Sequence, residues 1–226
     1  MKKNLLWMLA AILFCGSPAL AQVEPGTLSI IPKLGFLGAT LTHQPDLEVA
    51  EDVDLSTTLC PGFLIGADVD YQVNDFLSLS AGLNYTRQGG KWKDFRRPQI
   101  EIKDVQMILG YVNLPVMANV YLFKGFAVKA GVQLSYLTNA NSQYKLIWHV
   151  PNMPVEERKY DQSIMSKCNK FDFSIPFGLS YEVGDQIILD ARYNFGLSRL
   201  NKEKDPDGDP CNRYFLFTVG YRFPLN

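Results

Sequence analysis

Charged side chains stand at alternate positions within strongly apolar segments of this chain. In an extended strand, this spacing places the charges on one side and the apolar residues on the other. Enclosed charges must pair, because an isolated one costs several kcal/mol. Four acids and three bases nearly balance, so we predict an ion-pair network in which Arg192 bridges two carboxylates. The seven predicted members are Asp68, Asp70, Lys129, Glu182, Asp190, Arg192 and Arg222.

The two histidines, His43 and His149, are the residues that a hydrolase would need beside a serine and a carboxylate. Both fall in polar stretches rich in Ser, Asp and Glu, where the three residue types coincide easily by chance. No G-x-S-x-G nucleophile motif is present. We therefore expect no enzyme and no cofactor, and we keep a lipid hydrolase or acyl transferase as an alternative.

Three aspartates alternate around Gly208 between residues 199 and 212. Alternating carboxylates supply the hard oxygen ligands that calcium prefers, but the spacing is not that of an EF-hand. A solvated turn built from Asp, Pro and Gly explains the same residues, and we favour it. We therefore expect no metal, with Asp205, Asp207 and Asp209 as the calcium candidate.

A tryptophan stands among basic residues in the stretch 88–104. Such a surface could bind the phosphates of lipopolysaccharide or an acidic partner. An exposed tryptophan beside arginine is also typical of binding surfaces. Alternatively, the acidic stretch 42–59 neutralises these bases, each exposed pair contributing little, and the tryptophan joins an aromatic belt. The candidate binding surface comprises Lys91, Trp92, Lys93, Arg96 and Arg97.

Lys2 and Lys3, the apolar run Leu5–Phe14 and the small residues of Ala19-Leu20-Ala21 form a signal peptide of residues 1–21. The mature part is then a single domain, residues 22–226, in an oxidising compartment. It keeps three cysteines, which leave three disulfide pairings open. Cys168 and Cys211 precede the expected sixth and eighth strands, so we predict that they pair, with Cys60 as the competing partner.

The composition narrows the class of protein. Apolar residues make up 47% and charged residues 20%, which indicates an ordered chain. The net charge is −1, or 20 − 23 = −3 without Lys2 and Lys3, and so gives no reason to expect nucleic acid as a partner. After the signal, no run approaches the roughly 18 apolar residues of a membrane helix, which excludes a helical transporter.

With a period of two, the chain resolves into eight alternating segments. Tight turns at Asn74-Asp75, Lys124-Gly125 and Gly184-Asp185 alternate with the long stretches 42–59, 88–104, 139–168 and 199–212. Short turns on one rim and long loops on the other are typical of an outer-membrane barrel. The expected strands are Leu28–Leu41, Phe63–Val73, Phe76–Thr86, Val105–Phe123, Phe126–Leu137, Phe171–Val183, Ile187–Ser198 and Tyr214–Phe223.

One side of these strands carries Phe, Tyr and Leu, and the other carries Gly, Ser and the charges. Eight strands enclose room for only a modest set of side chains, so the bulky side must face lipid. Phe126 and Tyr136 stand ten residues apart on this side, which at ~3.3 Å per residue and ~40° tilt spans about 25 Å of membrane. The sequence predicts an all-β fold: an eight-stranded antiparallel up-and-down transmembrane β-barrel with short periplasmic turns and long extracellular loops.

Proline complicates this picture at Pro32, Pro115 and Pro176, which lie inside expected strands. A closed barrel has no edge on which to place a missing backbone donor. We therefore expect local bulges at Pro115 and Pro176.

Five segments of the expected strands and turns are "GLNYTRQGGK" (Gly82–Lys91), "YVNLPVMANVYL" (Tyr111–Leu122), "GFAVKAGVQLSYL" (Gly125–Leu137), "FDFSIPFGLSYEV" (Phe171–Val183) and "LDARYNFGLSRL" (Leu189–Leu200). They resemble the outer-membrane β-barrel proteins of Bacteroidetes, known as porin-family or PorT-like proteins. The resemblance implies an eight-stranded barrel, whereas most members have no assigned activity and PorT itself is tied to protein secretion.

We therefore expect a small integral outer-membrane barrel with a plugged lumen, acting through its extracellular loops in surface interaction or envelope structure. Its expected partners are outer-membrane lipid and lipopolysaccharide, the barrel-insertion machinery during biogenesis, and a surface protein. A pore or a PorT-like secretion component is the alternative.

Overall fold

The computed structural model describes residues 23–42, 57–96, 100–149, 156–184, 186–203 and 209–225. All eight predicted strands are present, and two have the predicted bounds. No helix in these ranges is long and apolar enough to cross a membrane. The strands are β1 (Leu28–Leu41), β2 (Thr57–Thr58), β3 (Cys60–Asn74), β4 (Leu77–Trp92), β5 (Phe95–Arg96), β6 (Ile100–Phe123), β7 (Phe126–Trp148), β8 (Glu156–Ser163), β9 (Phe171–Val183), β10 (Ile187–Arg199), β11 (Cys211–Tyr221) and β12 (Phe223–Pro224).

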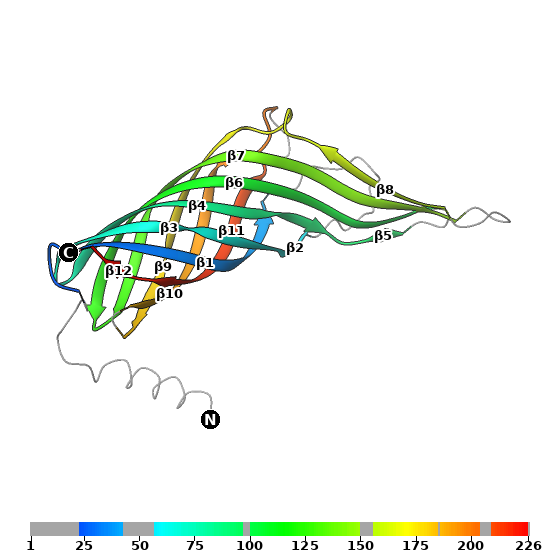
Figure 1. Ribbon diagram of the computed structural model, residues 1–226. Coiled ribbons are helices and arrows are strands. Elements are labelled where there is room, and N and C mark those ends of the chain that lie inside the picture. Colours follow the sequence, from blue (N-terminus) through cyan, green and yellow to red (C-terminus); the bar gives the residue numbers. More distant parts are fainter. Residues whose placement is uncertain are drawn as a thin grey trace, which may run out of the picture.

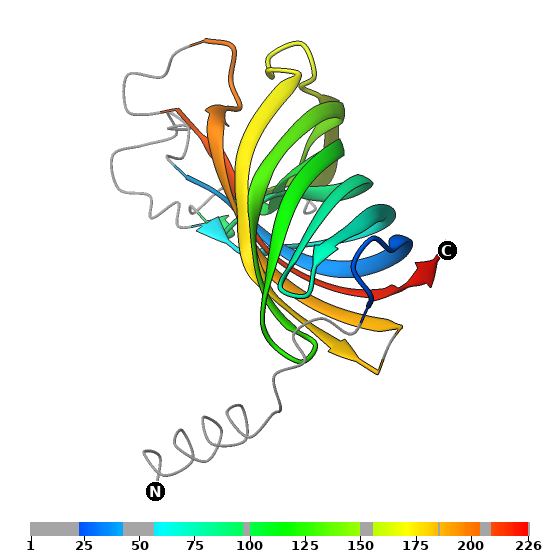
Figure 2. The same cartoon turned by 90° about the vertical axis from the view of Figure 1, so that its left-hand side faces the viewer.

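Eight of these strands close into a ring, β1-β3-β4-β6-β7-β9-β10-β11. Each pairs antiparallel with its neighbours in the chain, and β11 closes on β1 (Figures 1 and 2). Lys33↔Gly220 and Ile30↔Phe223 share one register, so β12 continues β11 beyond Arg222. The predicted eight-stranded up-and-down barrel is therefore confirmed.

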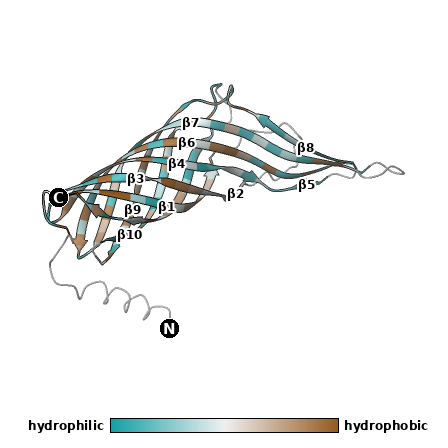
Figure 3. Cartoon of the chain, in the orientation of Figure 1, coloured by the Kyte–Doolittle hydropathy of each residue, from teal (hydrophilic) through white to brown (hydrophobic). Residues whose placement is uncertain are grey.

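Burial alternates along the strands as the period of two predicts. Outward residues are large and apolar, with exposed fractions of 76% for Phe36 and 63% for Phe217, whereas inward positions are polar and buried. Figure 3 shows the matching alternation of hydropathy along the strands. Such an exterior is expected of a barrel whose outer side faces lipid and whose polar side chains face the lumen.

The prolines do not produce the predicted bulges. On the β4 side of Pro115, the pairs Ala81↔Val116 and Asn84↔Asn113 belong to one register, so no residue is inserted between them. On the β7 side of Pro176, the pairing likewise resumes without a shift. A strand residue directs its N–H toward only one neighbour, so each proline interrupts one ladder and leaves the other intact. The expectation was wrong because a barrel tolerates a local gap in one ladder.

The stretches predicted as the second and third long loops are largely strand. β4, β6 and β7 continue beyond the ring, and β8 joins β7 over eight residue pairs, Asn141↔Ser163 to Trp148↔Glu156. The result is a sheet that projects from one rim of the barrel (Figure 1). We call it the projecting sheet. Its polar composition predicted loops rather than strands, because neither side of the sheet is buried along its whole length as the inner side of a barrel strand is.

A bulge marks where the projecting sheet departs from the ring. Leu137 pairs with Tyr111 and Asn139 with Gly110, so Thr138 is an extra residue in β7. Its hydroxyl donates to the Gly110 carbonyl at 3.0 Å. Beyond this residue β7 leaves β9 and pairs with β8 instead. The bulge thus allows one strand to serve both the barrel and the projecting sheet.

Candidate functional site

The structure brings all seven predicted charged residues into the lumen near the short turns, where each is buried. Arg192 donates to both oxygens of Asp190, from Nε at 2.6 Å and from Nη2 at 3.1 Å. Its Nη2 also lies 3.8 Å from Asp68. Lys129 reaches Asp190 at 2.7 Å. Arg192 therefore bridges two carboxylates, as its fixed planar geometry allows.

A second group of charges adjoins the first. Arg222 donates to Glu182 at 2.6 Å and lies 3.8 Å from Asp70. The Tyr121 hydroxyl also donates to Glu182, at 2.8 Å. The amide of Asn119 donates to Asp70 at 3.0 Å. Both carboxylates of this group are thus held by a cation and by a neutral donor, which compensates their desolvation.

Sequence reasoning missed Lys33, whose ammonium donates to Asp68. With this residue the network near the short turns has four acids and four bases, so it is neutral. Sequence reasoning also missed Asp172, a further buried acid of the lumen, which accepts a hydrogen bond from Asn212 at 3.1 Å. The signal for Lys33 was present in the first expected strand, because Ser29, Ile31 and Lys33 alternate on one side of it. The space left among these side chains is about 20 Å³, which is room for about one water molecule.

Neutral polar side chains fill the next layer of the lumen, away from the short turns. Gln133 donates to the Tyr214 hydroxyl at 3.1 Å. Asn113 donates to Thr86 at 2.9 Å, and Asn194 donates to Ser174 at 3.1 Å. The bond between Gln133 of β7 and Tyr214 of β11 crosses the lumen, whereas the other two join neighbouring strands of the ring.

An apolar cluster lies at the end of the lumen, at the rim that bears the projecting sheet. It contains the buried residues Leu41, Trp92, Leu109, Tyr111, Leu137, Ala140, Cys168 and Leu200. Ile164 and Met165, from the segment after β8, pack against it. We call this cluster the apolar cap. Ions, polar groups and apolar groups thus occupy successive layers along the barrel.

Only some residues of the candidate binding surface are exposed. Trp92 is 4% exposed in the apolar cap, so the prediction that it presents itself to a partner is wrong. It lies in β4 rather than a loop, and alternation turns it inward. Lys93 and Arg96 are exposed, and Lys91 lies 4.0 Å from Asp104. Arg97 lies outside the described residues.

The three cysteines in the described part of the chain, Cys60, Cys168 and Cys211, are free thiols. The disulfide predicted between Cys168 and Cys211 is therefore not formed, and Cys60 pairs with neither. Cys168 is a buried member of the apolar cap, and burial raises the pKa of its thiol. Packing rather than cross-linking is its structural role here.

The other chemistry-bearing candidates do not form a site among the described residues. His149 lies 3.5 Å from Glu101 on the projecting sheet, whereas His43 lies outside the described residues. Asp205 and Asp207 lie outside them too, so only Asp209 of the calcium candidate is placed. The described residues contain no group of three potential metal ligands.

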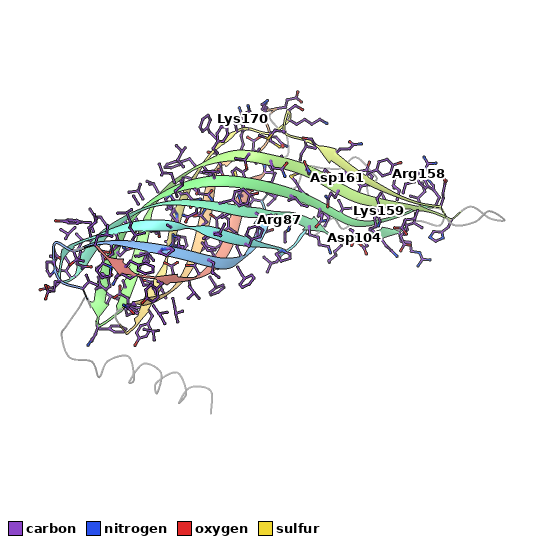
Figure 4. All side chains as sticks on the ribbon, viewed as in Figure 1. Arg87, Asp104, Arg158, Lys159, Asp161 and Lys170 are labelled. Atoms are coloured by element: carbon purple, nitrogen blue, oxygen red, sulfur yellow. The ribbon has the colours of Figure 1, made fainter. Side chains whose placement is uncertain are left out.

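The outer side of the projecting sheet carries a row of polar contacts. Gln106 of β6 donates to Gln143 of β7 at 2.9 Å, and Gln143 donates to Asp161 of β8 at 2.9 Å. One step further along, Lys145 lies 2.6 Å from Asp104. The bond and charge of Lys145 hold the pKa of Asp104 below its ordinary value. Asp104 and Asp161 are labelled in Figure 4.

Known proteins resemble this chain both as a family and as solved structures. The family described as outer membrane protein beta-barrel domain matches residues 20–201. No curated protein matches the chain. Ail, the attachment invasion locus protein of Yersinia pestis, is 15% identical, with 88% of this chain and 100% of that chain covered and a TM-score of 0.46. OprG from Pseudomonas aeruginosa is 10% identical, with 90% of this chain and 99% of that chain covered and a TM-score of 0.43.

Proposed function

Because the chain belongs to the outer membrane protein beta-barrel domain family, we propose that its filled barrel anchors an extracellular projecting sheet to the bacterial outer membrane. The sheet and the neighbouring loops then act in surface interaction or in the structure of the envelope. The signal peptide at residues 1–21 is part of this proposal, since export must precede insertion. The expected partners are lipopolysaccharide, the barrel-insertion machinery and a surface protein.

The filling of the lumen carries this proposal. A diffusion pore needs a continuous aqueous path, but ion pairs, polar bonds and the apolar cap occupy successive layers of this barrel. The space within the charged layer is about 20 Å³, which is about one water molecule. A plugged barrel leaves its outer surface and its extracellular part as the places where it can act.

Single-channel recording tests the plugged lumen. We expect the purified mature protein, inserted into planar bilayers, to give no large and stable conductance, while a general porin gives one in the same bilayers. Insertion is checked separately by protection of the barrel from added protease. Stable channels from the inserted protein would contradict the anchor function and favour the pore alternative.

The resemblance to PorT-like proteins supports a finer proposal, that the extracellular part assists protein secretion. Segments such as Tyr111–Leu122, which lie within β6, carry that resemblance. Deleting the gene and measuring secreted proteins by mass spectrometry tests it, with the wild-type gene restored as the control. Unchanged secretion would remove this role and leave the anchor function standing.

A further inference from the structure

A polar groove crosses the outer side of the projecting sheet. Its volume is about 450 Å³, and three strands, β6, β7 and β8, contribute to it. Three of the residues that line it, Asp104, Lys159 and Asp161, are labelled in Figure 4. The polar side chains that line it are Asp104, Gln106, Gln143, Lys145, Lys159 and Asp161.

The polar groups in the groove are fixed by the fold. Gln143 receives a hydrogen bond from Gln106 and donates one to Asp161, which sets the orientation of both amides. A second irregularity in β6, between Lys103 and Gln106, places Asp104 opposite β7. Asp104 has a φ of 53°, a region that aspartate tolerates better than most residues. Its backbone N–H donates to the Asp94 side chain, which stabilises this conformation.

These groups have the chemistry of a saccharide site. Amides and carboxylates provide donors and acceptors side by side, which matches neighbouring sugar hydroxyls that both donate and accept. Lys159 has no ion-pair partner among the described residues, so its ammonium can meet an anionic substituent such as a phosphate. The groove therefore combines hydroxyl recognition with one uncommitted positive charge.

The position of the groove indicates where the saccharide lies. Across the bulge at Thr138, the outward side of β7 runs from Tyr136, next to Phe171 at 5.3 Å, to Gln143 and Lys145. The groove thus continues the lipid-facing side of the barrel. At ~3.3 Å per residue and ~40° tilt, Gln143 lies roughly 15 Å beyond Tyr136. That height is above the acyl chains, where the sugars of the outer leaflet are found.

We propose that this groove binds the phosphorylated core saccharide of lipopolysaccharide molecules that surround the barrel. The proposal rests on the proposed function, because it requires the projecting sheet to be extracellular. It gives the sheet a ligand within the membrane that holds it. Gln143 and Asp161 bind sugar hydroxyls, and Lys159 binds a phosphate.

Calorimetric titration with deacylated lipopolysaccharide core oligosaccharide tests this assignment, using the full mature protein in detergent. We expect Gln143→Ala to weaken binding at least tenfold. Lys159→Gln should weaken binding of the phosphorylated oligosaccharide and leave binding of its enzymatically dephosphorylated form unchanged. A heparin oligosaccharide tests whether any anionic sugar suffices, and we expect it to bind more weakly than the core saccharide.

The control variant is Gln162→Ala, which changes the same residue type on the opposite side of β8. Its partner Ser142 is adjacent to Gln143, so it reports any general damage to the sheet. Equal binding by the wild type, Gln143→Ala and Lys159→Gln would overturn the site, as would no binding by the wild type. Either failure, in a protein that forms no channels, leaves the anchor function intact and removes only the saccharide site.

Discussion

Arg192 shows how a single residue can compensate the burial of two carboxylates in this lumen. One guanidinium serves Asp190 with two hydrogen bonds and approaches Asp68, while Lys33 and Lys129 neutralise the remaining charge. Removing one member would leave a carboxylate in a narrow space without its partner, and the desolvation of that carboxylate would no longer be compensated.

We therefore expect Arg192→Ala to lower the free energy of unfolding by about 3–5 kcal/mol, the range for breaking a buried ion pair. Urea unfolding in lipid vesicles, followed by tryptophan fluorescence, measures the change. Arg158→Ala is the matched control, since Arg158 is exposed and its pair with Glu156 contributes little. An Arg192→Ala protein as stable as the control would show that the network does not stabilise the barrel.

Alternation alone located seven of the eight charges of the ion-pair network, because a strand's side chains must fall on one side or the other. Lys33 and Asp172, which the prediction missed, also stand at inward positions of their strands, so the same alternation applies to them. Trp92 failed for a different reason. The residue type indicated a surface, but its inward orientation depends on β4 continuing to Trp92. Free energies of cross-strand pairing, which composition does not reveal, decide that continuation.

At the scale of elements, a glycine allows two strands of the ring to approach closely. The gap in the β7–β9 ladder falls between the pairs Ala130↔Phe177 and Gln133↔Ser174, and it contains Gly131 and Pro176. A Cβ at Gly131 would lie 2.0 Å from the Val116 carbonyl oxygen and 2.8 Å from Met117 Cα. The strands can approach there because glycine has no side chain. The turns and periods were readable from the sequence, but this close approach was not.

We expect Gly131→Val to prevent folding or to cost about 3 kcal/mol or more, since the neighbouring backbone must move. The folded fraction can be read from the heat-modifiable shift on gel electrophoresis. Ala130→Val is the control, because Ala130 is exposed on the lipid-facing side of the same strand. Equal folding of the two variants would contradict the close approach of β6 and β7.

At the scale of the molecule, the barrel and the projecting sheet are stabilised differently. The strands of the barrel pair in a closed ring around buried side chains, whereas the sheet has two half-exposed sides and a free edge at β8 in the described structure. The barrel could be predicted because lipid imposes a strict alternation on its strands. No such constraint acts on the projecting sheet, so its residues read as loops.

The barrel should therefore fold without the outer part of the sheet. Ser142 and Gln162 face each other across β7 and β8, so residues 143–161 can be replaced by an Asn-Gly turn that closes a two-residue hairpin. Because the excised residues of β7 and β8 lie outside the ring, we expect the free energy of unfolding of the variant to lie within about 1 kcal/mol of the wild-type value, as is usual for changes away from the core. It should remain non-conducting, because the apolar cap is retained, and it should lose binding of the core saccharide. Unfolding in vesicles, planar-bilayer recording and calorimetry measure these three properties on one protein. A variant that fails to fold would show that the sheet is part of the barrel's own stability rather than a structure built upon it.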